Sequence, residues 1–286
     1  MDLSWWSDVK KIVSKWITHL CGSTYRLLTP LEHAHPKKRR IIVIVEGLIG
    51  SGKSTLVKNL SQTLEKMGYS VCQILEPVDY WIETGILEKL YSNPSRFSVD
   101  FQVFAYMTRL VDINKSVAAN PNADIYLLER STESGKLFIP NFWDAIDPVE
   151  KVLLSYMFEN LTELLSLDLT TAHILYYNTS LPKCMERVKK RNRSEEVVHQ
   201  FDLPSGEPTA NHSRRVTKEY QTILSSTHNL LLSAKGRTSH EPVMRFIYDV
   251  PNSVIEIGPD MADIDAEDSS YEKRVLIPII DKLPLR

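Results

Sequence analysis

Runs of consecutive apolar residues alternate along this chain with stretches in which apolar residues recur at helical spacing. The first run, Ile41 to Val45, predicts a strand that is buried on both faces, because no polar residue interrupts it. After it, Leu56, Leu60 and Leu64 recur every four residues and predict a helix. Further strands are predicted at 71–75, 124–128, 173–177 and 254–257.

Helical stretches separate these predicted strands. The longest runs from Trp81 to Val117, and others are predicted at 148–167, 181–193 and 216–232. Residues 259–270 are acidic, and we predict that they form a loop. Strands that alternate with helices are typical of a doubly wound parallel sheet. We therefore predict an α/β fold of three layers, with helices on both sides of a parallel sheet, in a single domain over residues 41–286.

Residues 1–40 are expected to be an addition to this domain. One stripe of a predicted helix contains their apolar side chains: Trp5, Trp6, Val9, Ile12, Val13, Trp16, Ile17 and Leu20. Such a helix could pack on its own domain, lie on a membrane, dock on a partner or belong to a mitochondrial presequence. Asp2 and Asp8 disfavour the presequence, because such segments avoid acidic residues. The run Pro36-Lys-Lys-Arg-Arg40 fits a nuclear-localisation cluster, or a solvated lead-in to the first strand.

Composition and charge narrow the expected partners and compartment. The net charge of -2 gives no electrostatic reason to expect nucleic acid or an anionic membrane as a partner. Cys21, Cys72 and Cys184 lack the spacing of a metal site and indicate a reducing compartment. The longest apolar run is five residues, whereas a membrane helix needs about twenty. We therefore expect a cytoplasmic protein, and the N-terminal residues leave a nuclear or mitochondrial address open.

The first strand leads directly into Gly47-Leu-Ile-Gly-Ser-Gly-Lys-Ser54, which fits G-x-x-x-x-G-K-[ST] at every fixed position. Gly47, Gly50 and Gly52 let the backbone curl, so that its N–H groups point at phosphate oxygens. Lys53 is expected to reach the outer phosphates, and the Ser54 hydroxyl is expected to ligate Mg²⁺. A chance glycine-rich turn is the alternative, but the motif's required context of a strand before and a helix after is met.

This motif predicts a site for ATP, or another nucleoside triphosphate, together with Mg²⁺. The nucleotide contacts are expected from Gly47, Leu48, Ile49, Gly50, Ser51, Gly52, Lys53, Ser54 and Thr55.

Charged residues follow several of the predicted strands. Glu76 comes after the second strand and is either a site carboxylate or a helix-capping surface residue. Glu129 ends the third strand, where phosphate-loop enzymes place an acid that directs Mg²⁺. Arg187 and Arg191 share one helix face, which is either solvated or forms a lid over the transferring phosphoryl group. Gln102 lies on an apolar helix face and needs a partner there, such as a flat base or another side chain.

Five segments taken together resemble the deoxynucleoside kinases of the deoxycytidine, deoxyguanosine and mitochondrial thymidine kinase type. The segments are GLIGSGKST in the phosphate loop, EPVDYW at 76–81, LYSNPSRFSVDFQ at 90–102, ERS at 129–131 and ERVKKRNRSEE at 186–196. The resemblance covers about residues 40–260. It implies a phosphate-loop kinase fold, a homodimer, and transfer of the ATP γ-phosphate to the 5′-hydroxyl of a small-molecule deoxynucleoside.

The resemblance also implies roles for residues at matching positions. Glu76 would be the general base, and Arg130 would hold that carboxylate and the incoming hydroxyl. Glu129 and Ser54 would govern Mg²⁺. Arg191 and Arg193, with Arg187, would act from a lid over about residues 187–215. The nucleoside would be bound by Trp81, Tyr91, Phe101, Gln102, Arg109 and Glu196.

Two features depart from the family pattern. Arg109 falls where members of the deoxycytidine and purine type carry an arginine, but its usual aspartate partner is replaced by Gly135, as in thymidine-accepting members. The two positions therefore point to different bases, and Gly135→Asp is expected to give Arg109 a partner. The segment 199–215 reads as an insertion next to the lid. A thymidylate kinase and a non-catalytic structural subunit remain as alternative functions.

Overall fold

The computed structural model describes residues 40–191, 193, 216–233 and 253–285. The predicted N-terminal helix, the insertion at 199–215 and Glu196 lie outside the described residues. The lid is described only in part, through Arg187, Arg191 and Arg193.

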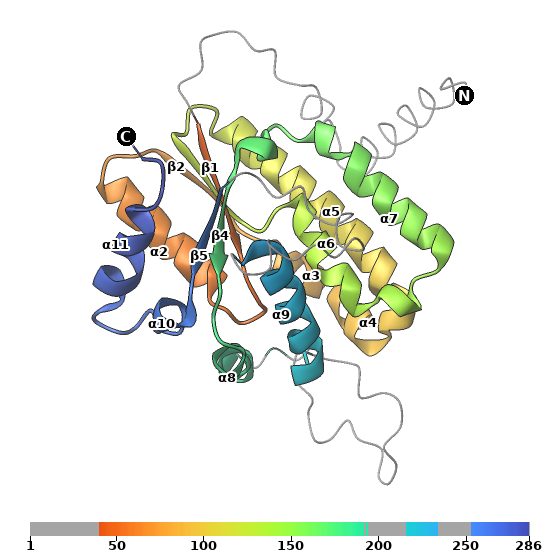
Figure 1. Cartoon of the computed structure of the whole chain (residues 1–286). Helices are drawn as coiled ribbons and strands as arrows, with labels where there is room; N and C mark the ends of the chain where they lie inside the picture. The colour runs from red at the N-terminus through yellow and green to blue at the C-terminus, as the bar shows by residue number, and fades with distance from the viewer. Residues whose placement is uncertain (1–39, 192, 194–215, 234–252, 286) are drawn as a thin grey trace.

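A parallel sheet of five strands forms the middle layer (Figure 1), as the sequence predicts. The strands are β1 (Ile41–Glu46), β2 (Val71–Ile74), β3 (Ile125–Glu129), β4 (His173–Tyr177) and β5 (Ser253–Ile257). Their order across the sheet is β2-β3-β1-β4-β5, and every neighbouring pair is parallel. The register places Val45 of β1 opposite Glu129 of β3, so the C-terminal ends of these two strands lie together.

Alternating side chains of β1 enter two different cores, which explains its uninterrupted apolar sequence. Val43 and Val45 pack on one face of the sheet with Leu56 and Leu60 of the following helix. Ile42 and Ile44 pack on the other face. A strand covered on both faces carries no polar alternation, because each face excludes water. The chain therefore has helices on both sides of the sheet, and the predicted three-layer fold is confirmed.

The helices divide between the two faces (Figure 1). They are α2 (Lys53–Lys66), α3 (Val78–Glu83), α4 (Ile86–Ser92), α5 (Pro94–Ala119), α6 (Gly135–Phe138), α7 (Pro148–Asn160), α8 (Leu181–Arg191), α9 (Lys218–Leu232), α10 (Pro259–Ala262) and α11 (Ile277–Ile280). Helices α2 and α11 lie on one side of the sheet, and α5 and α7 lie on the other. Among the described residues, no helix is both long and apolar enough to cross a membrane.

Two of the predicted helical boundaries need correction. The stretch from Trp81 to Val117 is divided among α3, α4 and α5. Gly85 separates the first two with a backbone φ of +71°, and Asn93 caps α5 through its side chain, with Pro94 next in the chain. The predicted loop at 259–270 begins with the short helix α10, because Pro259 and a helical register let Ala262 pack into the core.

The order of the strands fixes where a ligand can bind. The chain leaves β1 in one direction across the sheet and leaves β3 in the other, so the two strands flank a switch point. In open α/β sheets, ligands bind beyond the carboxyl ends of the strands at such a point. The phosphate loop after Glu46 and the pair Glu129-Arg130 at the end of β3 are therefore neighbours at this edge.

Candidate active site

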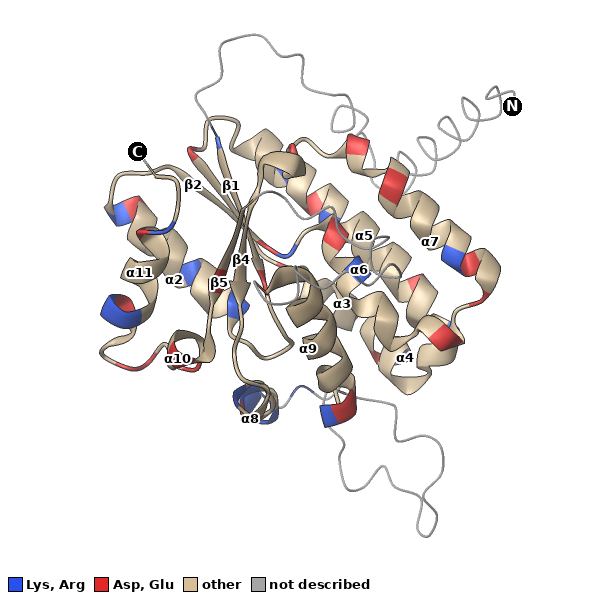
Figure 2. Ribbon diagram, in the orientation of Figure 1, with Lys and Arg blue, Asp and Glu red and all other residues tan. Residues whose placement is uncertain are grey.

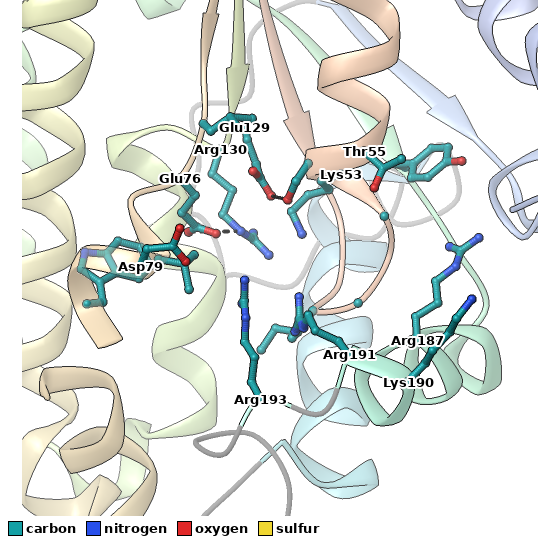
Figure 3. Close-up of a pocket in the computed structure, with 18 of the residues that line it drawn as sticks. Lys53, Thr55, Glu76, Asp79, Glu129, Arg130, Arg187, Lys190, Arg191 and Arg193 are labelled. Carbon is teal, nitrogen blue, oxygen red and sulfur yellow. Dashed lines mark hydrogen bonds and ion pairs between the residues drawn. The ribbon is translucent and has the colours of Figure 1, made fainter. Parts of the chain in front are cut away.

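A cleft of about 660 Å³ opens at the carboxyl edge of the sheet, at the switch point. Its walls come from the phosphate loop, the segments after β2 and β3, helices α5 and α8, and the C-terminal segment 264–271. Figure 3 shows its charged side chains: Glu76 and Arg130 point toward one another, while Arg191 and Arg193 reach in from α8 and the residues after it. The elements that carry these groups are far apart in the sequence.

The glycines of the phosphate loop are required by close contacts as well as by backbone angles. Gly50 has a φ of +78°, and a Cβ atom there would lie 2.5 Å from the carbonyl oxygen of Cys184. A Cβ atom on Gly47 would lie 2.6 Å from the carbonyl oxygen of Tyr177. Larger residues at either position would therefore push the loop away from α8 or β4.

Lys53 begins α2 and its side chain is buried in the loop. Its Nζ donates a hydrogen bond to the carbonyl oxygen of Leu48 at 2.9 Å. Burial and, to a smaller extent, the neighbouring charge of Arg130 lower the pKa of Lys53, which is about 8. The carboxylates of Glu129, Glu76 and Glu46 act the other way. A phosphate group arriving in the cleft would stabilise the charged amine.

The structure brings most of the predicted loop residues to the cleft. Its lining includes Ile49, Gly50, Gly52, Lys53, Ser54 and Thr55. Gly47, Leu48 and Ser51 are not among the lining residues, and the Leu48 side chain packs instead in a small core with Cys184 and Leu224. These three could face a phosphate only through backbone N–H groups.

Ser54 and Glu129 meet as the sequence predicts for a Mg²⁺ site. The Ser54 hydroxyl donates a hydrogen bond to Glu129 Oε1 at 2.7 Å. Mg²⁺ prefers oxygen ligands and is usually held by one or two carboxylates together with water and substrate phosphates. Ser54 and Glu129 supply oxygen atoms of this kind. Among the described residues there is no cluster of three or more His, Cys, Asp or Glu side chains for a metal.

Glu76 lies between two guanidinium groups. Arg109 donates a short hydrogen bond to Glu76 Oε1, and Arg130 Nε lies 3.6 Å from the same oxygen. Burial raises the pKa of Glu76, but Arg109, Arg130 and Lys53 lower it more, so the pKa is below its usual range. Glu76 is therefore ionised at neutral pH and faces the cleft.

The resemblance implies that Arg130 holds the Glu76 carboxylate, but the hydrogen bonds of Arg130 go to other acceptors. Its Nη1 donates to Glu46 Oε2 at 2.8 Å, and its Nη2 donates to the carbonyl oxygen of Gly47 at 2.7 Å. The direct hydrogen bond to Glu76 comes from Arg109 instead. Arg109 thus has a carboxylate partner despite the glycine at position 135.

An aromatic pocket lies beside Glu76. Trp81 and Phe101 pack edge to face with ring centroids 5.3 Å apart, and the Trp81 Nε1 donates to the Thr108 hydroxyl at 2.9 Å. The buried amide of Gln102 and the side chain of Tyr91 line the same part of the cleft. The predicted nucleoside-binding residues among the described ones are therefore brought together.

Gly135 packs against this pocket without room for a side chain. A Cβ atom there would lie 2.8 Å from Cζ of Phe158 and 2.9 Å from Oε1 of Gln102. An aspartate at 135 would have to displace both groups before it could reach Arg109. The expectation that Gly135→Asp simply supplies a missing partner does not fit this packing.

The three predicted lid arginines divide into two kinds. Arg187 donates to the carbonyl oxygen of Ser51 at 2.8 Å and to both Ala262 and Asp265, so it joins the phosphate loop to the C-terminal segment. All three arginines line the cleft, and Arg191 and Arg193 do so from the end of α8 and just beyond it. Figure 2 shows that α8 is densely basic, and its Arg187, Lys190 and Arg191 line the cleft.

The structure adds residues that the sequence reasoning missed. Asp79, Phe138, Lys190 and Tyr220 line the cleft, and Glu46 lies buried behind it. The sequence did contain a feature that could have identified Glu46 as a site residue, because it is a carboxylate at the end of an apolar strand, as Glu129 is. The contacts of Phe138 and Tyr220 come from helices that only the fold brings to the cleft.

Fold and site together define a phosphate-loop kinase of the α/β class. A profile of the family described as "Deoxynucleoside kinase" matches residues 43–203. A probable deoxycytidine kinase of Fowlpox virus is 32% identical over 242 residues, which cover 84% of this chain and 86% of the viral protein. This chain belongs to the deoxynucleoside kinase family.

Two vertebrate relatives show more distant similarity. Mitochondrial thymidine kinase 2 of Homo sapiens is 28% identical over 175 residues, or 59% of this chain and 62% of the human protein. Deoxycytidine kinase 2 of Gallus gallus is 29% identical over 184 residues, or 56% of this chain and 68% of the chicken protein. The names of these relatives cover different bases, so similarity alone assigns no base to this chain.

The burial of Lys53 predicts a pH dependence for binding the triphosphate. Because the pKa of Lys53 in the ligand-free protein is about 8, the amine loses its charge above that pH. We expect kcat/KM for the triphosphate to fall about tenfold per pH unit above this point, as for one essential proton. Steady-state kinetics across pH measures it. The control is Lys53→Arg, which stays charged: its activity should be lower, but its kcat/KM should not fall at high pH. A wild-type kcat/KM that stays flat above this pH would contradict the prediction.

The close packing at Gly135 predicts that a single methyl group added there weakens nucleoside binding. Gly135→Ala places Cβ against Phe158 and the Gln102 amide, so Gln102 must shift from its present position. We expect KM for the nucleoside to rise by about 3- to 10-fold, equivalent to about 1 kcal/mol for one weakened hydrogen bond, with a smaller change in kcat. Thermal unfolding of the variant controls for a general loss of stability. An unchanged nucleoside KM would rule out this steric effect.

Proposed function

We propose that this kinase transfers the γ-phosphoryl group of ATP, or of another nucleoside triphosphate, to the 5′-hydroxyl of a deoxyribonucleoside. One observation carries the proposal: the ionised, largely buried carboxylate of Glu76 lies between the phosphate loop and an aromatic pocket. A phosphate donor on one side and a flat nucleoside on the other would place a hydroxyl at this carboxylate. The family match supports the same reaction.

In the proposed reaction, Glu76 accepts the proton of the 5′-hydroxyl. The hydroxyl oxygen forms a bond to the γ-phosphorus, and the bond from that phosphorus to the β–γ bridging oxygen breaks. The products are a nucleoside monophosphate and a nucleoside diphosphate. A side chain within reach of the proton and ionised at the working pH is what general-base catalysis requires.

Charge stabilisation would come from the residues around the phosphate loop. Lys53 at the start of α2 and the backbone N–H groups of residues 47–54 would hold the donor phosphates. Arg191 and Arg193 line the opposite wall and would face the charge on the transferring group. Mg²⁺ bound with Ser54 and Glu129 would neutralise the phosphate oxygens.

Nucleoside recognition would use the aromatic pocket. Trp81 and Phe101 would enclose the base, and the Gln102 amide would exchange paired hydrogen bonds with it. Tyr91 would bind the sugar together with Glu196, which lies outside the described residues. The guanidinium of Arg109 lies over Trp81 with its Cζ 5.0 Å from the ring centroid, so it borders both the base and Glu76.

The alternatives of a thymidylate kinase and a non-catalytic subunit are less well supported. An acceptor phosphate would need cations of its own near Glu76, and both arginines there are already paired with carboxylates. A subunit without activity would not need Lys53, Glu76 and Glu129 gathered at one cleft.

We propose the cytoplasm as the location.

A second copy of this chain is the partner we propose, and α7 provides a surface for it. Val149, Val152 and Leu153 are 76%, 68% and 51% exposed, and they share one face of this helix at spacings of three and four residues. A contiguous apolar stripe of this kind on the outside of a domain is unusual without a partner. A two-fold axis through this face would pair the stripe with itself.

Replacing the proposed base should separate binding from chemistry. Glu76→Gln keeps the size of the side chain and a hydrogen-bond acceptor but cannot take the proton. We expect turnover to fall by about two or more orders of magnitude, while nucleoside affinity changes little. Phosphoryl transfer from ATP-Mg²⁺ to each of the four deoxynucleosides and to dTMP, with calorimetric binding beside it, measures both. Unchanged turnover would remove Glu76 from the role, and transfer to dTMP alone would favour the thymidylate kinase.

A charge on the α7 stripe should split the proposed dimer. Val152→Glu places a carboxylate in the centre of the contact, where it would be buried against a second copy. We expect sedimentation to change from dimer to monomer. Ile277→Glu is the matched control, because Ile277 is 46% exposed on α11 at the other side of the sheet, and it should leave the dimer intact. A monomeric wild type, or a Val152→Glu dimer, would contradict the proposal.

A further inference from the structure

A second carboxylate, Glu46, is buried at the edge of the sheet where the cleft opens. It is the last residue of β1 and comes directly before the phosphate loop. Its side chain has no solvent exposure. Burial raises the pKa of Glu46 above its usual range, and the ion pair with Arg130 is the main influence that favours its charged form. An ionised group that is fully buried is costly unless partners hold it, so its contacts define what it does.

Both carboxylate oxygens of Glu46 have partners. Arg130 Nη1 donates to Oε2 at 2.8 Å, and the Ser134 hydroxyl donates a short hydrogen bond to Oε1. Ser134 is itself fixed, because its hydroxyl also accepts from the backbone N–H of Ser131 at 2.8 Å. Glu46 therefore connects the end of β1 to the segment that follows β3 and fixes one edge of the Arg130 guanidinium.

The other restraints on Arg130 leave one edge of its guanidinium for the cleft. Its Nη2 donates to the carbonyl oxygen of Gly47, and its Cζ lies 4.6 Å from the ring centroid of Phe138. Its backbone φ is +63°, and Arg130 is the one non-glycine residue in the described part of the chain with a positive φ. Such a conformation persists only where the surroundings impose it. With these contacts made, Nε is directed at Glu76 from 3.6 Å.

We propose that Glu46 is a positioning residue for phosphoryl transfer: it holds Arg130 at a distance from Glu76, so that the carboxylate stays available to the 5′-hydroxyl. The inference rests on the proposed function, in which Glu76 is the base. Without the charge of Glu46, Glu76 becomes the main carboxylate left beside the buried Arg130. The guanidinium would then move onto Glu76, which Arg109 already holds, and occupy the oxygens that should receive the proton.

A purely structural ion pair is the competing explanation. It would account for the burial of Glu46 and Arg130, and its loss would lower stability. It would not change how Glu76 takes a proton once the protein has folded. The two explanations therefore differ in the pH dependence of turnover and in whether the effect of Glu46 depends on Glu76.

The test is Glu46→Gln in the full-length enzyme, with kcat followed across pH. Glutamine keeps the shape and can still accept a hydrogen bond from Arg130, but it has no charge. The charged groups facing Glu46 are Arg130, Lys53 and Arg109, so removing its charge leaves an excess of positive charge around Glu76. The pKa of Glu76 then falls, and we expect the acidic limb of kcat to move to lower pH while kcat at neutral pH drops about tenfold or more.

Two further variants complete the experiment. In a Glu76→Gln background, Glu46→Gln should cause little additional loss in kcat, because its effect acts through Glu76. Glu133→Gln is the matched control, since Glu133 is ion-paired with Lys136 away from Glu76, and it should leave kcat and its acidic limb unchanged. If Glu46→Gln does not fold, Ser134→Ala removes one of the two contacts of Glu46 and should lower kcat in the same direction by a smaller factor.

The outcomes separate this proposal from the proposed function. If Glu76→Gln loses turnover while Glu46→Gln lowers only the melting temperature, with kcat and its acidic limb as in wild type, Glu46 is structural and the positioning role is overturned. Equal losses from Glu46→Gln with and without Glu76 would overturn it as well. If Glu76→Gln keeps full turnover, the assignment of the base fails first.

Discussion

The pairing of buried charges at the switch point of the sheet is the constraint on which the rest of this site depends. Two carboxylates, Glu46 and Glu76, and two guanidiniums, Arg109 and Arg130, meet there with little contact with water. Any one of these charges alone would be costly to bury, and in the cluster each lies beside a group of opposite charge. The cluster joins the ends of β1, β2 and β3 to α5, so the nucleoside side and the phosphate side of the cleft are fixed relative to one another.

The same cluster connects recognition with chemistry. Arg109 lies over Trp81 in the aromatic pocket and donates to Glu76, so one guanidinium contacts both the proposed nucleoside pocket and the proposed proton acceptor. Its carboxylate partner is Glu76, whereas position 135 is a glycine at which a Cβ atom would lie 2.8 Å from the Phe158 ring. In the proposed function, the choice of base would depend on this packing and on Gln102, and not on Arg109 alone.

Local patterns predicted most of the fold and much of the proposed site. The five strands lie where the apolar runs predict them. The inner strands β1, β3 and β4 are buried along nearly their whole length and are therefore almost entirely apolar, whereas the edge strands β2 and β5 carry Gln73 and Glu256. The stretch from Trp81 to Val117 is helical as predicted, except at breaks near Gly85 and Asn93 that periodicity alone does not register. The sequence prediction did not include Glu46, although its position at the end of a strand was visible in the sequence. The contacts of Arg187 with the C-terminal segment join residues about 75 positions apart, so no local pattern could predict them.

The sequence alone determined the parallel sheet, the phosphate loop and the family to which the chain belongs. These follow from short-range features: apolar runs, the spacing of glycines and a lysine, and segments in a fixed order. Only the tertiary structure decided which charges pair. Glu46, Glu76, Arg109 and Arg130 lie on different elements, and the partner of each depends on distance and burial across the sheet. Those quantities arise when the strands come into register, so no local pattern contains them.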